Sequence, residues 1–525
     1  MAVLIFLLNL IVFILVLGII ILLHELGHFF VAKKFNVLCH EFSIGMGPAI
    51  YQKRKGETIY SIRSIPIGGY VSIAGEDNDD ALFKVGDMIG LRVNQDDQVE
   101  GIVLHESLQY DVIGQVISFE LFDRDQEELH IRLELEDGTI NRYLVLEDAK
   151  YYFEKEKQLQ ITTKERSLSQ KPKWQRFLVL FAGAFMNFVL AFFLLILGYA
   201  IIGKPVEEAR VKRVIKDGPL QEIVDMKDFT VESVNGNPIN TWADLKQAIY
   251  ENPGKEITLK IDKKEEPITV KTRIAVDIIG VYNFTKAEDN KPSEVTDGEL
   301  IVGQSSNVKD GSINPLETGD KILKVNGAVV LTWQDLIEKV ENLQDTQVTI
   351  EYLREGEVRE TTYGIFPADI LKTQGYAAYR VFIGVEQATK FNLGYALQMG
   401  FVGFGQDATA IFKILGALFT PNSGVSVKNL AGPVGIFTII SRVRSEGFAA
   451  VLLFMAFLSV NVGLINLLPI PALDGGRILF LIIEAIIRRP LNKKVETWVN
   501  GIAFILLMIL FVYILGIDIL RIIRR

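Results

Sequence analysis

The sequence has a single cysteine, Cys39, among its 525 residues. One thiol excludes an internal disulfide and a cysteine-rich zinc finger. The chain also lacks an excess of positive charge, and its formal net charge of −9 at pH 7 gives no support to nucleic-acid binding. Charged residues make up 23% and hydrophobic residues 49%, with a mean hydropathy of +0.26. These values argue against a single soluble globule and against a disordered chain, and they predict apolar blocks that alternate with polar ones.

Four apolar runs without charged residues are long enough to cross a bilayer, which takes about 20 residues. The first run has no basic segment before it and no small-residue cleavage site after it, so we interpret it as a retained span rather than a signal peptide. A fifth apolar stretch, Phe391–Gln406, is shorter and is followed by Asp407 and Lys413, which favours an interfacial amphipathic helix. The predicted fold class is a multi-pass α-helical membrane protein whose four spans are Ala2–Leu23, Phe177–Gly203, Gly447–Leu473 and Thr497–Ile517.

Basic residues near the ends of the spans predict the orientation of the chain. With four spans, three basic clusters fall on the same side, which is then the cytosolic side. The N-terminus and the long region 204–446 would lie outside the cell membrane. Three basic residues of the tail, Arg521, Arg524 and Arg525, fall on the outer side against this trend. The clusters are Lys33, Lys34, Lys53, Arg54 and Lys55, then Lys171, Lys173 and Arg176, then Arg488, Arg489, Lys493 and Lys494.

Residues 76–170 form a polar insertion on the predicted cytosolic side. Leucine and isoleucine alternate with polar residues from Leu129 to Leu135, Asp137-Gly138 is a turn signal, and Tyr143–Leu146 is suited to the returning strand. This pattern predicts a β-hairpin in a small β-rich module. The sequence assigns the insertion no chemistry.

The outer region contains an internal repeat with an offset of 91 residues. Val234-Asn235-Gly236 recurs as Val325-Asn326-Gly327, and Thr241–Leu245 recurs as Thr332–Leu336. The segment Gly319–Gly327 resembles the PDZ signature of bacterial envelope proteases, whereas the first copy has Asp228-Phe229 in place of the Gly-Asp turn. We predict two α+β PDZ-like domains at residues 206–290 and 291–388. They would either bind peptide C-termini or extended segments by strand addition, or act only as folded spacers.

The segment His24-Glu25-Leu26-Gly27-His28 is an H-E-x-x-H motif at the end of the first span. Positions i and i+4 share one face of a helix, so both imidazoles can bind one metal ion. Glu25 lies beside them and can accept a proton from a water molecule. The alternative is a pair of histidines that cap the end of a helix.

A catalytic zinc site usually has three protein ligands, and Asp474 is the candidate for the third. It is the first charged residue after the third span, in the segment Asn466–Gly476. Spans one and three run in the same direction, so His24 and Asp474 are predicted at a similar depth on the cytosolic side. Pro469 and Pro471 exclude a regular helix just before Asp474. The alternative is that Asp474 only caps the following helix.

These two motifs, HELGH and NLLPIPALDGG, resemble the site-2 protease family of intramembrane zinc proteases. The bacterial branch cleaves anti-sigma factors and related membrane proteins, and remnant signal peptides are further possible substrates. It carries PDZ domains between its second and third spans. The resemblance covers residues 1–75, 171–385 and 430–520, and the insertion lies outside it. It implies a span with H-E-x-x-H and a membrane-associated β-hairpin at 1–75, a second span at 171–205, an interfacial segment at 389–446 and the last two spans at 447–525.

The resemblance also implies roles for individual residues. His24, His28 and Asp474 would bind Zn²⁺, and Glu25 would be the general base and acid. The hairpin around Ile65–Val71, with Gly68, Gly69 and Tyr70, would lie beside the substrate and pair with its unwound segment. Asn461 and Asn466 would offer amide groups to the substrate, although each could instead bond another helix. One departure is Ala184, which stands where the family often has a proline.

The resulting hypothesis is an intramembrane zinc metalloendopeptidase that cleaves single-pass membrane proteins, with the PDZ-like domains gating access. Two other classes remain open. The first is a membrane-anchored metalloprotease of soluble or misfolded proteins, in which Asp474 would be dispensable. The second is a non-catalytic PDZ scaffold, whose function would survive Glu25→Gln. A transporter is disfavoured because the spans show no inverted repeat.

Overall fold

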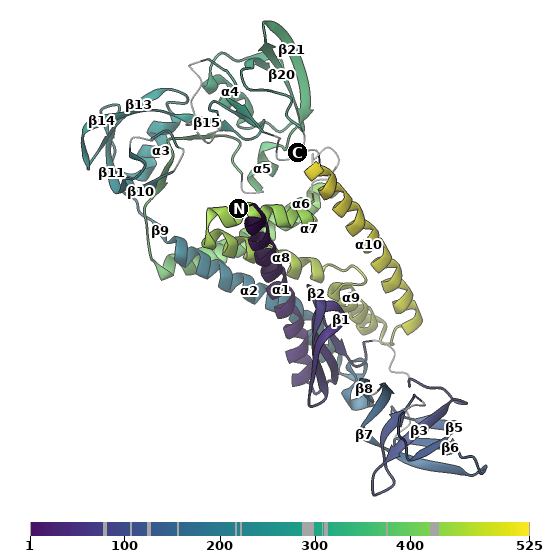
Figure 1. The fold of residues 1–525 in the computed structure, drawn as a ribbon. Helices are drawn as coiled ribbons and strands as arrows, with labels where there is room; N and C mark the ends of the chain where they lie inside the picture. The colour runs from purple at the N-terminus through teal and green to yellow at the C-terminus, as the bar shows by residue number, and fades with distance from the viewer. Residues whose placement is uncertain are drawn as a thin grey trace. The chain divides into compact units, whose positions relative to one another are not determined.

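The structure is a computed structural model that describes most of the chain (Figure 1). The chain forms two compact units, which we describe separately. One comprises residues 1–192, 437–446 and 454–511, and the other comprises residues 193–436, 447–453 and 512–525. The described residues are 2–76, 81–105, 108–122, 128–154, 157–215, 218–220, 223–285, 299–306, 308, 313–373, 376–420 and 430–523. Arg524 and Arg525, which entered the orientation argument, lie outside them, as does the predicted boundary between residues 290 and 291.

Within the described ranges, five helices are long and apolar enough to cross a membrane. Four of them coincide with the predicted spans, and the fifth is α6. The predicted short helix at Phe391–Gln406 was wrong in length, because α6 continues for 27 residues past Asp407 and Lys413. A helix satisfies its own backbone hydrogen bonds, so two charged side chains do not end it. The count of four spans is therefore not confirmed. The five helices are α1 (Ala2–Lys34), α2 (Lys173–Ile202), α6 (Leu393–Phe419), α8 (Phe448–Leu467) and α10 (Lys493–Ile523).

Two shorter helices flank α8. Helix α7 (Pro433–Glu446) precedes it, and α9 (Asp474–Ile487) follows after an irregular segment at residues 468–473. That segment contains the two prolines, as predicted. Its shape depends on Gly475 and Gly476, because a Cβ atom on either would lie 2.2–2.3 Å from the carbonyl oxygen of Leu468 or Ile470.

A long hairpin, β1 (Cys39–Lys55) and β2 (Thr58–Ile73), follows α1 in the first unit. Residues 41–44 of β1 pair on one side with residues 59–62 and on the other side with residues 69–72. Among the described residues, the end of β2, residues 69–73, pairs with the start of β1 alone and is therefore an outer strand. The predicted strand at Ile65–Val71 is part of this longer element.

The insertion folds as a small β-barrel. Strand β4 pairs in parallel with β7 as well as antiparallel with β3, so the ring β3–β5–β6–β7–β4 closes. The predicted hairpin is confirmed as β6 and β7, and Ile131 and Leu133 are fully buried in its core. Closure of the barrel was not predicted, because a parallel pair links strands that are distant in sequence. The strands are β3 (Met88–Val93), β4 (Val99–Val103), β5 (Val112–Glu120), β6 (His130–Glu134), β7 (Ile140–Glu154) and β8 (Lys157–Gln160).

The barrel begins and ends at the base of the hairpin. The Leu168 N–H donates to the carbonyl oxygen of Ala74 at 2.8 Å, and the Leu38 N–H donates to that of Arg166 at 3.0 Å. Leu168 and Arg166 lie in two short 3₁₀ helices, Lys164–Arg166 and Leu168–Gln170, that lead into α2. The entry and exit points of the insertion are thus close together.

The second unit contains two segments with the same succession of elements. Each has a strand, a two-residue strand, a helix and a β-hairpin, and both helices begin with a Thr–Asp capping box. The first segment has β10 (Arg210–Val214), β11 (Lys227–Val234), β12 (Asn237–Pro238), α3 (Trp242–Tyr250), β13 (Glu256–Ile261) and β14 (Lys264–Lys271). The second has β17 (Gln304–Ser305), β18 (Lys321–Val325), β19 (Ala328–Val329), α4 (Trp333–Val340), β20 (Gln347–Arg354) and β21 (Glu357–Gly364).

Strand exchange interleaves these two segments across the predicted boundary. β16 pairs with β17 of the second segment, and β15 pairs with β22, whereas β23 returns to pair with β10 of the first. The outermost strands β9 and β24 pair with each other and bring the two ends of the region together. The additional elements are β9 (Lys204–Pro205), β15 (Arg273–Val276), β16 (Val281–Tyr282), α5 (Ala368–Thr373), β22 (Arg380–Phe382), β23 (Val385–Gln387) and β24 (Thr389–Lys390).

Candidate metal centre

Helix α1 presents His24 and His28 on one face, one turn apart. Both side chains are buried, with 8% of each residue exposed. The helix continues to Lys34 without interruption, so the motif lies inside a regular helix rather than at its end. The structure therefore disagrees with the alternative that the two histidines cap a helix terminus.

The irregular segment between α8 and α9 brings Asp474 to the same place. One carboxylate oxygen, Oδ2, lies 3.2 Å from His24 Nε2 and 3.3 Å from His28 Nε2. The two Nε2 atoms are 3.2 Å apart. Residues about 450 positions apart in sequence thus converge on one point within the first unit.

The donor set fits a zinc ion. Zinc binds nitrogen and oxygen at about 2.0–2.2 Å with tetrahedral angles, which separates neighbouring ligand atoms by about 3.3 Å. The three separations match this value. Asp474 Oδ2 is buried without a hydrogen-bond partner, and a buried carboxylate oxygen needs one. Among the described residues, His24, His28 and Asp474 are the group whose ligand atoms lie within 4.8 Å of one another.

Helix α2 supports both histidines from behind, which the sequence did not predict. His28 Nδ1 lies 2.8 Å from the carbonyl oxygen of Val179, and His24 Nδ1 lies 3.2 Å from the side-chain nitrogen of Asn187. Gly183 lies between them, and a Cβ atom there would be 2.2 Å from His28 Nε2. On α1, a Cβ atom on Gly27 would be 2.3 Å from the carbonyl oxygen of Ala182. The available signal was Asn187, a polar residue inside an apolar span.

Glu25 is half-buried beside the two histidines and faces the hairpin. A Cβ atom on Gly69 would lie 3.6 Å from Glu25 Cγ and 2.8 Å from the carbonyl oxygen of Ser43. The absence of a side chain at Gly69 therefore lets the outer strand lie close to Ser43 of β1, and it leaves Glu25 within ordinary contact distance. Gly68 has a positive φ of 96°, a conformation that favours glycine.

Tyr70 points into a polar cluster on the hairpin. Its hydroxyl donates to Glu41 Oε2 at 2.8 Å and accepts from Arg63 at 2.5 Å. Burial and the bond to Glu41 raise the pKa of Tyr70 to about 12, so its hydroxyl stays protonated at neutral pH. These contacts give Tyr70 a structural role within the hairpin.

The two asparagines of the third predicted span lie in α8. The amide nitrogen of Asn461 donates to the carbonyl oxygen of Phe457 at 3.0 Å, within the same helix. Asn466 is half-buried in the last turn of α8.

The only cysteine of the sequence, Cys39, is buried at the base of the hairpin. Burial raises the pKa of its thiol to about 12, so the thiol is a poor nucleophile.

The chain is similar to known proteins over most of its length. The sequence profile of peptidase family M50 matches residues 12–510. The chain is 30% identical over 506 residues to the Regulator of sigma-W protease RasP of Bacillus subtilis (strain 168), covering 96% of each protein. It is 28% identical over 512 residues to the Zinc metalloprotease RasP of Shouchella clausii (strain KSM-K16), covering 97% of this chain and 98% of that protein.

Proposed function

The chain belongs to peptidase family M50, the site-2 protease family, and from this we propose that it is an intramembrane zinc endopeptidase. It hydrolyses a peptide bond in the transmembrane segment of single-pass substrates. The convergence of His24, His28 and Asp474 around one point carries this proposal. The name of the relative in Bacillus subtilis supports membrane proteins that control a sigma factor as a substrate class.

In this proposal, His24 and His28 bind zinc through Nε2, and Asp474 binds it through Oδ2. When bound, the ion would supply Lewis-acid chemistry: it would polarise the scissile carbonyl and lower the pKa of a water molecule. Glu25 accepts the proton of the attacking water and returns it to the leaving amine. The half-buried position of Glu25, beside both histidines and the outer strand of the hairpin, supports this role.

The hairpin strand 69–73 pairs with the substrate at the cleavage site. A transmembrane helix must unwind before its peptide bonds can be attacked, and the freed N–H and C=O groups need partners in a dry environment. Within the part of the chain that the structure describes, residues 69–73 pair with β1 on one side only, and Gly69 lies next to Glu25. We assign Asn466 an additional contact with the unwound segment. The same role for Asn461 requires its bond to Phe457 to open.

The active site faces the cytosolic side, and the tandem PDZ-like region lies outside. Asn9 of α1 contacts Ser441 of α7, just before α8 begins, and His24 contacts Asp474 just after α8 ends. These contacts support parallel directions for α1 and α8, which requires an odd number of crossings between them. Helix α2 supplies one crossing. The 14 residues of α7 span only about 21 Å, which is too short for a second crossing. This parity favours an α6 that does not cross the bilayer completely.

Cleavage of a model transmembrane peptide by the purified full-length chain tests the proposal. We expect Glu25→Gln to retain zinc and to lose about 10²- to 10⁴-fold in turnover, because the general base is missing. Glu100→Gln is the matched control, since Glu100 is exposed on the barrel, and it should match the wild type in both measurements. Wild-type turnover in Glu25→Gln contradicts the assignment, and absence of cleavage by the wild type contradicts the proposed activity.

A further inference from the structure

One face of α2 contacts both imidazoles of the candidate metal centre. Val179, Gly183 and Asn187 are spaced by four residues, so they lie above one another on the helix. Val179 contributes a carbonyl oxygen to His28, Gly183 leaves room for both rings, and Asn187 contributes its side chain to His24.

The contact with Val179 sets the hydrogen of His28. A carbonyl oxygen only accepts, so the bond at 2.8 Å requires the hydrogen on Nδ1. The lone pair of the neutral ring is then on Nε2, the nitrogen that faces Asp474. A backbone carbonyl thereby gives His28 the tautomer that can bind a metal ion through Nε2.

Asn187 can do the same for His24 in one of its two amide orientations. When the Asn187 amide nitrogen, Nδ2, points towards His24 Nδ1, that ring nitrogen has to accept the hydrogen bond. In the neutral ring the hydrogen is then on Nε2, where it points at the metal-binding position. In that orientation Asn187 Oδ1 is also buried without a hydrogen-bond partner. A half-turn of the amide exchanges oxygen and nitrogen with little change in shape. The oxygen then accepts the hydrogen of His24 Nδ1, and Nε2 is free to bind the ion.

The position of Asn187 is linked to the third ligand through α8. Asn187 is fully buried, and its backbone carbonyl oxygen accepts from Ser459 Oγ at 2.8 Å. Ser459 is also fully buried, and it lies on the helix that leads into the segment before Asp474. A Cβ atom on Gly463, one turn further along, would lie 2.6 Å from a ring carbon of Phe188, so α2 and α8 are in close contact here.

We propose that Asn187 is a positioning residue that fixes His24 as the Nδ1–H tautomer, through its side-chain oxygen, so that Nε2 binds zinc. The inference rests on the proposed zinc site of His24, His28 and Asp474. Outer hydrogen bonds of this kind typically change metal affinity about 10- to 100-fold. They act on metal binding itself, so the effect is measurable without any cleavage reaction.

The test is the zinc affinity of the purified full-length chain, measured by competition with a chelator, for the wild type and three variants. Asn187→Leu keeps the size of the side chain and removes the acceptor, and we expect about a 10- to 100-fold loss of affinity. Asn187→Asp keeps an acceptor for His24 Nδ1–H and should stay within about threefold of the wild type. Glu100→Gln changes an exposed side chain of the barrel and is the control, which should match the wild type.

The two Asn187 variants separate positioning from simple packing. If the residue only fills space, leucine is tolerated and a buried aspartate is the more damaging change. Wild-type affinity in Asn187→Leu, or equal losses in both variants, overturns the inference. Failure of the wild type itself to bind zinc overturns the proposed metal centre instead.

A measurement on the wild type covers the case in which Asn187→Leu does not fold. The chain has only five histidines, so ¹⁵N-histidine labelling gives few signals. We expect the zinc-loaded chain to show His24 with a protonated Nδ1 and a zinc-bound Nε2. A His24 ring without a hydrogen on Nδ1 contradicts the inference.

Discussion

At the scale of single residues, Glu41 holds the outer strand of the hairpin near the candidate metal centre. Its carboxylate accepts hydrogen bonds from Ser61, Arg63 and Tyr70. Burial alone raises the pKa of Glu41, but these bonds outweigh burial and lower it below its ordinary value. The ionised carboxylate is thus the form that the folded hairpin prefers.

Acidification should therefore weaken the hairpin. A lowered pKa in the folded state gives stability that is present above the ordinary glutamate pKa, about 4.3, and is lost as the pH falls through the lower folded value. We expect Glu41→Gln to be less stable than the wild type at pH 7 and to approach it below about pH 4. Thermal unfolding midpoints at both pH values test this, with Glu100→Gln as the control. A constant difference between Glu41→Gln and the wild type would contradict the role of Glu41.

The ligand residues were predictable from the sequence, whereas their supports were not. H-E-x-x-H is a local pattern with a fixed helical geometry, and Asp474 follows from the direction of the spans. Asn187 and the carbonyl oxygen of Val179 contact the histidines from α2, which carries none of the three proposed ligands. The residue spacing within α1 therefore gives no indication of these contacts. The role of Tyr70 was also not predictable from local sequence, because its partner Glu41 lies on the neighbouring strand.

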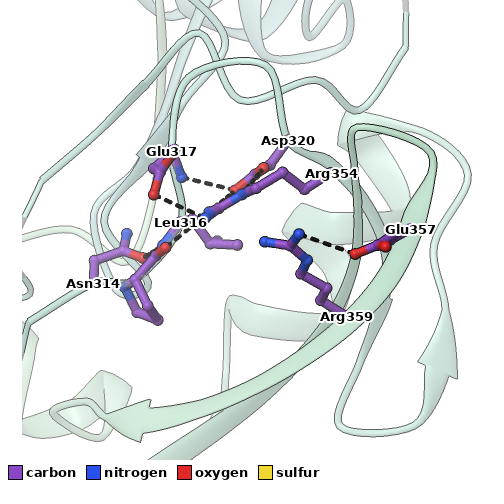
Figure 2. A network of polar contacts seen from close by, with 8 residues as sticks. Asn314, Leu316, Glu317, Asp320, Arg354, Glu357 and Arg359 are labelled. Carbon is purple, nitrogen blue, oxygen red and sulfur yellow. Dashed lines mark hydrogen bonds and ion pairs between the residues drawn. The ribbon is translucent and has the colours of Figure 1, made fainter.

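At the scale of secondary-structure elements, an ion pair fixes the turn before β18 to the end of β20 in the tandem region. Figure 2 shows Arg354 with two bonds to Asp320, at 2.7 and 2.8 Å, and a further bond to Glu317. The side chain of Asp320 is only 1% exposed. In the first segment the corresponding residue is Phe229, which is buried, and Lys263 stands in place of Arg354. Both partners differ together, so the first segment has neither the buried carboxylate nor the arginine at these two positions.

Removal of the arginine alone should destabilise the second segment. In Arg354→Met, Asp320 stays buried and keeps only the backbone N–H of Glu317, so we expect a loss of about 1–3 kcal/mol. Arg359→Met is the matched control, because Arg359 pairs with Glu357 on the exposed surface, and it should change little. Proteolysis between residues 206 and 388 at increasing urea concentrations measures the difference. Equal urea midpoints for the two variants would show that the ion pair contributes nothing.

The long elements were predictable, and the pairing of short ones was not. Amphipathic repeats and capping residues indicate α3 and α4, and the hairpin β6–β7 follows from alternation and a turn signal. Strands of two or three residues, such as β16, β17 and β23, carry too little periodicity to predict their partners. The pairing of β23 with β10 depends on contacts across more than 100 residues, as in the pair Val211 and Gln387.

At the scale of the whole molecule, the tandem region begins and ends at one point. Thr389 pairs with Pro205 and Lys390 pairs with Lys204, so residues 206–388 can be replaced by a short Gly-Ser linker without separating these ends. If the region screens substrates, the replacement should leave zinc content and cleavage of a short transmembrane peptide unchanged. It should also raise the cleavage of full-length substrates towards that of substrates whose outer domain has been removed. The ratio of the two cleavage rates is the measurement, and an unchanged ratio would contradict gating.

The central claim is that the chain binds one zinc ion between α1 and the start of α9. Zinc stoichiometry of the purified full-length chain, measured for the wild type and for Asp474→Ala under the same chelator concentration, tests it most directly. We expect about one zinc per wild-type chain and a large loss in Asp474→Ala, because two imidazoles alone bind the ion weakly. One tightly bound zinc in Asp474→Ala, together with wild-type cleavage of the model peptide, would contradict it.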